Sequence, residues 1–369
     1  MTIIPAQGRD DVRGRHHIGA RLASPPGDER SGEWADKLWW AVRTADEYAA
    51  VAVVTDAVAA GMEPERVLLE VIGAVQHKVG IEWAANRMSV AEEHSATAIN
   101  DRVIAVLTAP GGQPPRGRLT VACVDKEWHA LPARLLAETL RLRGWQVDYL
   151  GAQVPTAHLI SHVHRTGPAA VCLSAALSVR LPLAHAAISA CQAAGVPVMV
   201  GGLAFGADGR YARLLGADAW ERDARAAADR LASAPLPPPR PPHQAIDDLP
   251  HLGDQEYTMV TQSARSLVSG TLEGLQQRFP AMRDYDDAQR ERTAEDIAHI
   301  VDFLAAALYV NDADCFTGFL AWTAEILTAR GVPARSLPPC LDLLEERLKD
   351  FPRSRSLLDA GRTALASCS

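Results

Sequence analysis

The sequence predicts an α/β domain flanked by two all-helical regions, and three observations lead to this fold class. Short β-branched runs alternate with helical patterns over residues 118–232, as in a doubly wound parallel sheet. Residues 33–108 are rich in alanine with helical periodicity, and residues 254–366 show apolar steps of three and four. Stretches rich in proline and glycine separate these regions, so we expect three structured domains.

Glycine and proline residues set the predicted boundaries of helices and domains. Gly61 with Pro64, and then Gly80, divide the first helical region into four or five short helices. Residues 235–242 are mostly proline, which predicts a semi-rigid spacer. The predicted regions are a disordered tail (1–31), a helical bundle that caps the site (32–108), an α/β domain (116–232), a proline-rich linker (233–253) and a helical domain (254–369).

Composition and charge narrow the functional classes. The chain has 369 residues and a formal net charge of −8, so its charge does not suggest nucleic-acid binding. No apolar run is long enough to cross a bilayer, and the polar N-terminus lacks the apolar segment of a signal peptide. The six cysteines lack the spacing of a disulfide framework or a zinc site. We therefore expect a cytoplasmic protein that does not contact membranes.

Five short β-branched runs define the predicted sheet. The single helix between successive runs implies right-handed crossovers and parallel strands. In such sheets ligands bind beyond the carboxyl ends of the strands, so the residues that follow each run are candidates for a site. The runs are Leu119–Val124, Gln146–Leu150, Ala169–Ser174, Val196–Val200 and, more weakly, Ala217–Trp220.

The segment after the first run, Val124–Pro132, holds the principal candidate, His129. Neutral imidazole is a good ligand for cobalt, and a nearby carboxylate fixes its tautomer and raises its basicity. Asp125 or Glu127 would supply that carboxylate. A lone histidine in a loop is more often a surface residue, so the assignment of His129 as a cobalt ligand depends on the other candidate residues of the sheet edge.

Two further candidates follow later runs. Ser174, with Leu177 three residues on, offers a hydroxyl to a ligand nitrogen, although it would serve equally well as a helix cap. Gly201 and Gly202, followed by Leu203, would let the backbone approach a bulky ligand without a Cβ clash. A plain strand-to-helix turn is the favoured reading of an isolated pair of glycines.

The order of these residues resembles the cobalamin-binding domain of methionine synthases, mutases and corrinoid proteins. That family carries Asp-x-His-x-x-Gly, Ser-x-Leu and Gly-Gly after successive strands. The resemblance implies that His129 becomes the lower axial ligand of cobalt, displacing the nucleotide base of the cofactor, whose tail threads past Ser174 and the glycines. This sequence departs from the pattern at Glu127, at Pro132 in place of glycine, and in a Ser-to-Leu spacing one residue longer. The implied contacts are Asp125, Glu127, Trp128, His129, Ser174, Leu177, Gly201, Gly202 and Leu203.

A second constellation precedes the α/β domain. Ser89 with Glu92 forms a capping box, so we expect a helix to begin directly after Ser89 and to carry Glu93 and His94 near its start. Trp83 ends the preceding helix, so its ring would meet Glu93 and His94 over one surface. Core packing is the alternative for the tryptophan, and a solvated helix face is the alternative for the Glu-His pair.

Trp83, nine intervening residues and Glu93-His94 resemble the Trp-x9-Glu-His signature of CarH-type photoreceptors, which sense light with adenosylcobalamin. The resemblance covers about residues 35–230. It implies that the bundle lies over the upper face of the corrin, with Trp83 against the adenosyl group and Glu93 hydrogen-bonded to it. Ala84 replaces the His that follows the Trp in the best-known branch. Only a short polar segment stands where that family has a winged-helix domain, so we expect no direct DNA binding.

The C-terminal region is expected to be all-helical and shows no recognised enzyme motif. The succession of bundle, cobalamin domain and helical domain resembles the photocobilins, photoreceptors that add a biliverdin beside the cobalamin. The resemblance implies that this helical domain is globin-like. His299 and Arg265 are candidates to hold the bilin and Cys315 or Cys340 to attach it, with surface placement and buried thiols as alternatives. Aromatic residues at helical spacing, more often core than pocket, are Tyr257, Phe303, Tyr309, Phe316, Phe319 and Trp322.

These observations together predict a photoreceptor without a catalytic domain. Adenosylcobalamin is the expected cofactor, with cobalt held by His129, and biliverdin is the expected second chromophore. We expect a homo-oligomer whose assembly changes in light, signalling by self-association or through a separate effector protein. The alternative is a corrinoid methyl carrier, one component of a methyltransferase system, which would need an open upper face that the Trp83 cap would obstruct.

Overall fold

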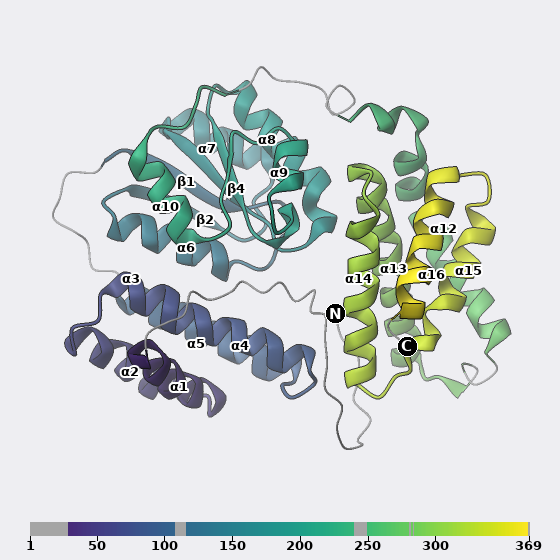
Figure 1. The fold of residues 1–369 in the computed structure, drawn as a ribbon, viewed down its shortest axis with the longest axis horizontal. Coiled ribbons are helices and arrows are strands. Elements are labelled where there is room, and N and C mark those ends of the chain that lie inside the picture. Colours follow the sequence, from purple (N-terminus) through teal and green to yellow (C-terminus); the bar gives the residue numbers. More distant parts are fainter. Residues whose placement is uncertain (1–28, 108–115, 240–248, 280–281, 283, 368–369) are drawn as a thin grey trace. The chain divides into compact units, whose positions relative to one another are not determined.

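The computed structural model divides the chain into two compact units, which we describe separately (Figure 1). The first unit contains the N-terminal helices and the α/β elements, up to the proline-rich segment, and the second contains the C-terminal helices. The described residues are 29–107, 116–239, 249–279, 282 and 284–367. The predicted N-terminal tail falls almost entirely outside these residues.

The bundle of the first unit forms because each helix buries one apolar stripe. Leu38, Val54, Ile72 and Ile104 come from four different elements and are fully buried in one cluster. Gly61, with a φ of 83°, follows the second helix as predicted, whereas Gly80 lies inside a helix and does not interrupt it. The elements are α1 (Glu29–Arg43), α2 (Glu47–Ala59), α3 (Pro64–Arg66), the π-helical η1 (Val67–Ile72), α4 (Gly73–Ala84) and α5 (Val90–Leu107).

The predicted parallel sheet is present, with strand order β2-β1-β3-β4-β5 and every pairing parallel. Helices cover both faces of the sheet, with α6 and α10 packed together on one side and α7 and α8 on the other (Figure 1). The fold-class prediction is therefore confirmed. The strands are β1 (Arg118–Cys123), β2 (Gln146–Gly151), β3 (Ala170–Ser174), β4 (Val198–Gly201) and β5 (Ala219–Trp220). The helices are α6 (Leu131–Leu142), α7 (Thr156–Thr166), η2 (Ser178–Arg180), α8 (Leu181–Ala193), η3 (Leu203–Phe205), α9 (Arg210–Leu214) and α10 (Ala224–Ser233).

Side chains from the bundle and the α/β elements meet within the first unit. Leu131 of α6 is buried in the core cluster of the bundle, and Leu135 packs against that cluster. The Arg143 guanidinium donates to both oxygens of Glu65, at 2.8 Å each. Arg225 donates to Glu70 at 2.9 Å. Apolar packing and paired charges thus join the two parts.

The second unit is all-helical. Its first long helix places the carboxylate of Glu256, 4% exposed, at the start of the last helix, where it accepts from the backbone N–H groups of Arg353 and Ser354. Thr293 with Asp296 has the residue types of an N-cap, and the sequence predicts a helix start there. This prediction is wrong, because α13 starts earlier, with a capping box between Asp286 and Gln289. The elements are η4 (Pro250–Asp254), α12 (Glu256–Arg278), α13 (Asp287–Val310), α14 (Ala313–Ala329), η6 (Ala334–Ser336), α15 (Pro338–Arg347) and α16 (Pro352–Ser367).

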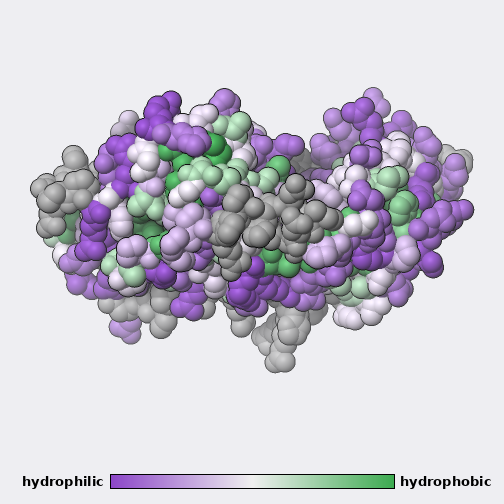
Figure 2. Space-filling model, turned by 90° about the horizontal axis from the view of Figure 1, so that it is seen from above, coloured by the Kyte–Doolittle hydropathy of each residue, from purple (hydrophilic) through white to green (hydrophobic). Residues whose placement is uncertain are grey.

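Hydrophilic residues cover most of the surface in the space-filling view, with smaller hydrophobic areas between them (Figure 2). None of the helices within the described ranges is both long enough and apolar enough to span a membrane.

Candidate functional site

The candidate site lies at the carboxyl edge of the sheet, where the loops after the parallel strands lie side by side. His129 stands in the loop between β1 and α6, and its side chain is 56% exposed. The neighbouring Trp128 is 70% exposed. The ring of Trp128 is therefore open to a ligand that binds beside His129.

Glu127 is the carboxylate that holds His129, which settles the choice left open with Asp125. Its Oε1 lies 2.6 Å from the Nδ1 of His129 and also accepts the backbone N–H of His129 at 2.9 Å. Because a carboxylate only accepts hydrogen bonds, Nδ1 carries the proton and Nε2 keeps its lone pair. The imidazole is therefore prepared to bind a metal through Nε2.

Glu127 also ties together the loops after three strands. Its Oε2 accepts from the backbone N–H groups of Ala176 and Leu177, in the loop after β3, at 2.8 and 3.3 Å. Its backbone carbonyl accepts from the N–H of Gln153, in the loop after β2, at 3.0 Å. Burial alone would raise the pKa of Glu127, but the hydrogen bonds from His129 and Ala176 outweigh it and lower the pKa to about 2. The carboxylate is thus ionised when it holds the loops.

The charge on the bundle reaches the imidazole. The hydrogen bond from Glu127 is the largest influence on His129 and raises its pKa, against the opposing effect of burial. The negative charge of Glu93, on α5, raises it further, and the positive charge of Arg180 lowers it. Glu93 therefore lies within electrostatic range of His129, which links the bundle and the sheet edge in one candidate site.

The other predicted residues of the sheet edge occupy the loops after β3 and β4. Ser174 ends β3 and is 9% exposed, and Leu177 is half-buried beside the Glu127 carboxylate. Leu203 is 47% exposed at the start of η3. Gly202 has a φ of 99°, and a Cβ there would come within 2.3 Å of the Ala175 carbonyl oxygen. The loop after β3 therefore fills the space beside Gly202, which we had expected to favour close approach of a ligand.

The capping box between Ser89 and Glu92 is confirmed, and α5 begins at the predicted place. The Ser89 N–H donates to Glu92 at 2.7 Å, and the Glu92 N–H donates to the Ser89 hydroxyl at 3.2 Å. The Oε2 of Glu93 lies 2.8 Å from the Nδ1 of His94, whose side chain is 75% exposed. Trp83 ends α4 half-buried, where it packs against the bundle core. Its ring contributes to packing, as the alternative reading anticipated.

These residues fit a corrinoid. A single exposed imidazole with a free Nε2 is a suitable donor for a metal whose other positions a macrocycle already fills. The exposed apolar side chains of Trp128 and Leu203 lie on the same edge of the sheet and suit a broad, flat ligand. Glu93 adds an acceptor on the bundle side.

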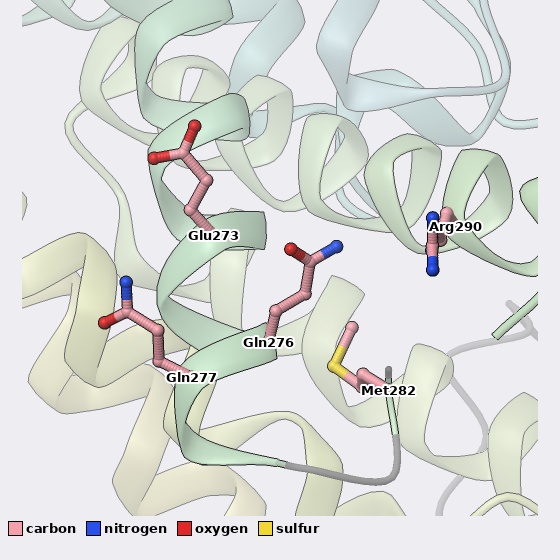
Figure 3. A pocket seen from close by; sticks show the side chains of 5 residues that line it. All are labelled: Glu273, Gln276, Gln277, Met282 and Arg290. Carbon is pink, nitrogen blue, oxygen red and sulfur yellow. The ribbon is translucent and has the colours of Figure 1, made fainter. Parts of the chain in front are cut away.

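The C-terminal unit has a depression of about 470 Å³ between α12 and α13, lined by Glu273, Gln276, Gln277, Met282 and Arg290 (Figure 3). This lining is polar, unlike the apolar walls of most cofactor sites. The aromatic residues of the unit pack against one another instead. The rings of Phe303 and Phe319 stack with centroids 3.8 Å apart, and Tyr257 meets Tyr309 edge-on at 4.9 Å. Burial raises the pKa of the Cys340 thiol to about 12, which disfavours the thiolate that would attack a bilin.

Comparison with known protein families finds two matches within the first unit. Residues 117–232 match the family described as B12 binding domain, and residues 34–108 match a second family with the same description. These segments coincide with the α/β elements and with the bundle. They indicate a cobalamin, or a related corrinoid, as the cofactor of this module.

Two curated proteins of Myxococcus xanthus are similar to the same part of the chain. The HTH-type transcriptional repressor CarH is 30% identical over 194 residues, which cover 51% of this chain and 63% of CarH. The HTH-type transcriptional repressor CarA is 30% identical over 185 residues, covering 48% of this chain and 62% of CarA. The similarity thus spans somewhat less than two thirds of either relative.

Two solved structures are also similar. The monomethylamine corrinoid protein of Methanosarcina barkeri matches at 19% identity with a TM-score of 0.46, covering 55% of this chain and 98% of that one. A cobalamin-binding protein of Desulfitobacterium hafniense matches at 21% identity with a TM-score of 0.31, covering 54% of this chain and 97% of that one.

Proposed function

We propose that the chain is a light sensor that uses adenosylcobalamin and that light changes its quaternary structure. The observation that carries the proposal is the pairing of two groups within one compact unit. His129 presents Nε2 from the sheet edge, and Glu93, which follows Trp83 at the CarH-type spacing, lies on a bundle helix of the same unit. The similarity to two proteins named transcriptional repressors supports a regulatory role over a metabolic one.

Each residue of the site has a stated task in this proposal. Bound adenosylcobalamin supplies a cobalt–carbon bond that visible light breaks. Glu127 holds the His129 ring so that Nε2 points to the cofactor and ties the loops that support the tail. Glu93 offers a carboxylate oxygen to the hydroxyl groups of the adenosyl moiety, and Trp83 shields that moiety from water.

The output of the proposed sensor is a change in assembly. Trp83 is half-buried against the core of the bundle, so loss of the upper ligand would remove a packing partner from the remaining exposed side of its ring. A local packing change of this kind shifts an equilibrium between two arrangements of protomers. We propose a homo-oligomer that signals by self-association or to a separate effector protein, without catalysis of its own.

The test is reconstitution of the full chain with adenosylcobalamin in the dark, followed by green light. Visible spectra and size-exclusion chromatography are recorded before and after illumination. We expect an irreversible change of the cobalamin bands together with a shift in elution volume, and His129→Ala should weaken uptake. Preferential binding of methylcobalamin with no light-driven change in assembly would contradict the sensor and favour a methyl carrier.

We extend the proposal to biliverdin as a second chromophore in the C-terminal unit. His299 on α13 supports it, because its Nδ1 is buried without a hydrogen-bond partner among the described residues and Phe303 follows one turn later. The test is incubation of the full chain with biliverdin and separation of free pigment. A red-absorbing band that remains with the protein, and that His299→Ala weakens, is expected. Absence of uptake would leave the C-terminal unit as a docking domain.

A further inference from the structure

A chain of polar side chains runs through the bundle and ends at Glu93. Asn100 donates through Nδ2 to the Oε1 of Gln76 at 2.7 Å, and Gln76 donates through Nε2 to the hydroxyl of Thr97 at 2.9 Å. The Thr97 hydroxyl donates to the Oε1 of Glu93 at 3.0 Å. Gln76 belongs to α4 and the other three residues to α5. The chain therefore connects two helices to a single carboxylate oxygen.

The direction of every bond in this chain follows from the carboxylate. Glu93 as a carboxylate accepts only, so the single proton of the Thr97 hydroxyl must point to it. Thr97 can then only accept from Gln76, whose amide NH2 group faces Thr97 and whose carbonyl faces Asn100. Asn100 in turn must offer its NH2 group. Bonds aligned in this way polarise one another and strengthen the last one, at Glu93.

The alignment of these hydrogen bonds has an energetic cost at Asn100, the buried end of the chain of side chains. Asn100 is fully buried, and its Oδ1 has no hydrogen-bond partner among the described residues. A buried carbonyl left unpaired costs about 1–3 kcal/mol, whereas an apolar residue at this place in the core would cost nothing of the kind. Its neighbours on the same face of α5, Ala96, Val103 and Ile104, are apolar and fully buried. A polar residue held here at a cost indicates a role other than folding.

We propose that Gln76, Thr97 and Asn100 are positioning residues that fix Glu93 and make the upper face selective for a hydroxyl-bearing ligand. This inference rests on the proposed function. Thr97 donates to Oε1 of Glu93, and the Nδ1 of His94 lies 2.8 Å from Oε2, so both carboxylate oxygens are held in fixed directions. Each oxygen keeps the capacity to accept a further hydrogen bond, which a sugar hydroxyl would donate. A methyl ligand has no donor and would gain nothing from this acceptor.

The central test compares the dissociation constants of adenosylcobalamin and methylcobalamin, titrated in the dark into the full chain. Thr97→Val keeps the shape of the side chain and removes the hydroxyl, so we expect the preference for adenosylcobalamin to fall about tenfold with methylcobalamin affinity unchanged. Thr97→Ser should restore the preference. Thr55→Val is the matched control, since the Thr55 hydroxyl donates only to the Val51 carbonyl on α2. Combining Thr97→Val with Glu93→Gln should add no further loss, because both remove the same interaction.

A second variant separates positioning from folding. Replacing Gln76 and Asn100 together by leucine removes both inner polar partners, so the free energy of unfolding should stay the same or increase. The preference for adenosylcobalamin should nevertheless fall, because Thr97 is then free to rotate away from Glu93. A loss of stability with an unchanged preference would show that the chain is structural and would overturn the inference.

A measurement on the cofactor-free protein distinguishes a failure of the role of Thr97 from a failure of the proposed function. The side-chain amide resonances of Gln76 in a nitrogen-15 NMR spectrum should shift in Thr97→Val and stay in place in Thr55→Val. If wild type binds both cobalamins equally although the Gln76 resonance responds, the proposed function fails and the selectivity with it. If wild type prefers adenosylcobalamin and Thr97→Val retains that preference, only the present inference fails.

Discussion

At the scale of single residues, Glu127 combines two tasks that are usually divided. One oxygen fixes the tautomer of His129, and the other joins the loop after β3 to the loop after β1. Because the carboxylate is almost completely buried and ionised, each of its hydrogen bonds is charge-assisted. The metal-ligand candidate and the loops that frame the site are therefore held by the same group.

We expect Glu127→Gln to weaken both functions at once. The neutral amide turns an NH2 group toward either the imidazole or the Ala176 N–H, so at least one bond is lost. Affinity for cobalamin should fall roughly 10- to 100-fold, as for other residues that orient a metal ligand. The free energy of unfolding of the cofactor-free protein should fall by about 2 kcal/mol. Absorbance titration and urea denaturation measure the two effects.

The control for this prediction is Glu63→Gln, which alters an exposed carboxylate that does not cap its helix. Glu63→Gln should change neither the affinity for cobalamin nor the free energy of unfolding. Normal stability of Glu127→Gln would mean that the loops do not depend on the carboxylate.

Gly202→Ala should destabilise the first unit by roughly 3 kcal/mol. Its positive φ is unfavourable for alanine, and the added Cβ would clash with the Ala175 carbonyl oxygen, which belongs to the backbone and cannot turn away. Gly195→Ala is the matched control, since Gly195 has a φ of 79° but open space around it, and should lose only about 1 kcal/mol. Urea denaturation of both variants measures the difference. Equal losses would refute the role of the close contact.

The residues of the site were only partly predictable from the sequence. His129 and a carboxylate beside it could be found because they are neighbours in the chain. The choice between Asp125 and Glu127 depends on the backbone reversal at Lys126, whose φ of 62° no local pattern required. The bond from Ala176 to Glu127 spans 49 residues and needs the fold. Asn100 had a usable signal, a polar residue among apolar positions of a helix.

At the scale of elements, the sheet was predictable and some helix limits were not. Each β-branched run overlaps a strand, and its ends lie within two residues of the ends of that strand. The match is close because buried parallel strands consist of nearly continuous apolar residues. The start of α13 was missed because Thr293 has the residue type of a cap, while the actual capping box begins at Asp286, about two turns earlier. The hydroxyl of Thr293 bonds to the Gln289 carbonyl inside the helix instead.

The contact between η1 and α10 should depend on pH through Glu70. Burial tends to raise the pKa of Glu70, but hydrogen bonds from Arg66, Arg225 and Ser31 outweigh it and lower the pKa below the ordinary 4.5. A lowered pKa in the folded state stabilises the protein above pH 4.5, and this contribution is lost as the pH falls further. Glu70→Gln should therefore be less stable than wild type by about 1–2 kcal/mol at pH 7.

The difference between Glu70→Gln and wild type should shrink as the pH falls below 4.5, because Glu70 is then protonated in the unfolded chain first and, at still lower pH, in the folded protein. Chemical denaturation at a series of pH values measures it. Glu33→Gln, at an exposed position of α1, serves as the control with no difference at any pH. A gap that stays constant down to pH 3 would show that the charge of Glu70 is not what matters.

At the scale of the whole molecule, two compact units imply two unfolding transitions. A ligand that binds only the folded first unit stabilises that unit by about 2.7 kcal/mol at a hundredfold excess over its dissociation constant. In calorimetry of the full chain, dark adenosylcobalamin should therefore raise one transition temperature and leave the other in place. A single transition that shifts as a whole would show that the units unfold together.

The transition that cobalamin leaves in place can be assigned with Glu256→Gln. The buried carboxylate of Glu256 caps α16 by accepting from the Arg353 and Ser354 N–H groups and from the Ser354 hydroxyl at 2.8 Å. Loss of its charge should lower the transition of the C-terminal unit by several degrees. The cobalamin-sensitive transition should keep its temperature.

The unequal burial of Glu127 and His129 has a consequence for how the two residues would evolve. In a lineage that no longer needed the pigment, an imidazole that is 56% exposed would accumulate replacements freely, since little of the fold depends on it. Glu127 would be retained by selection for a foldable sheet edge, because three loops depend on it. Descendants that no longer bind the cofactor would therefore keep the acid and lose the histidine, and a genome survey that counts the acid alone would overestimate how many of these proteins still bind cobalamin.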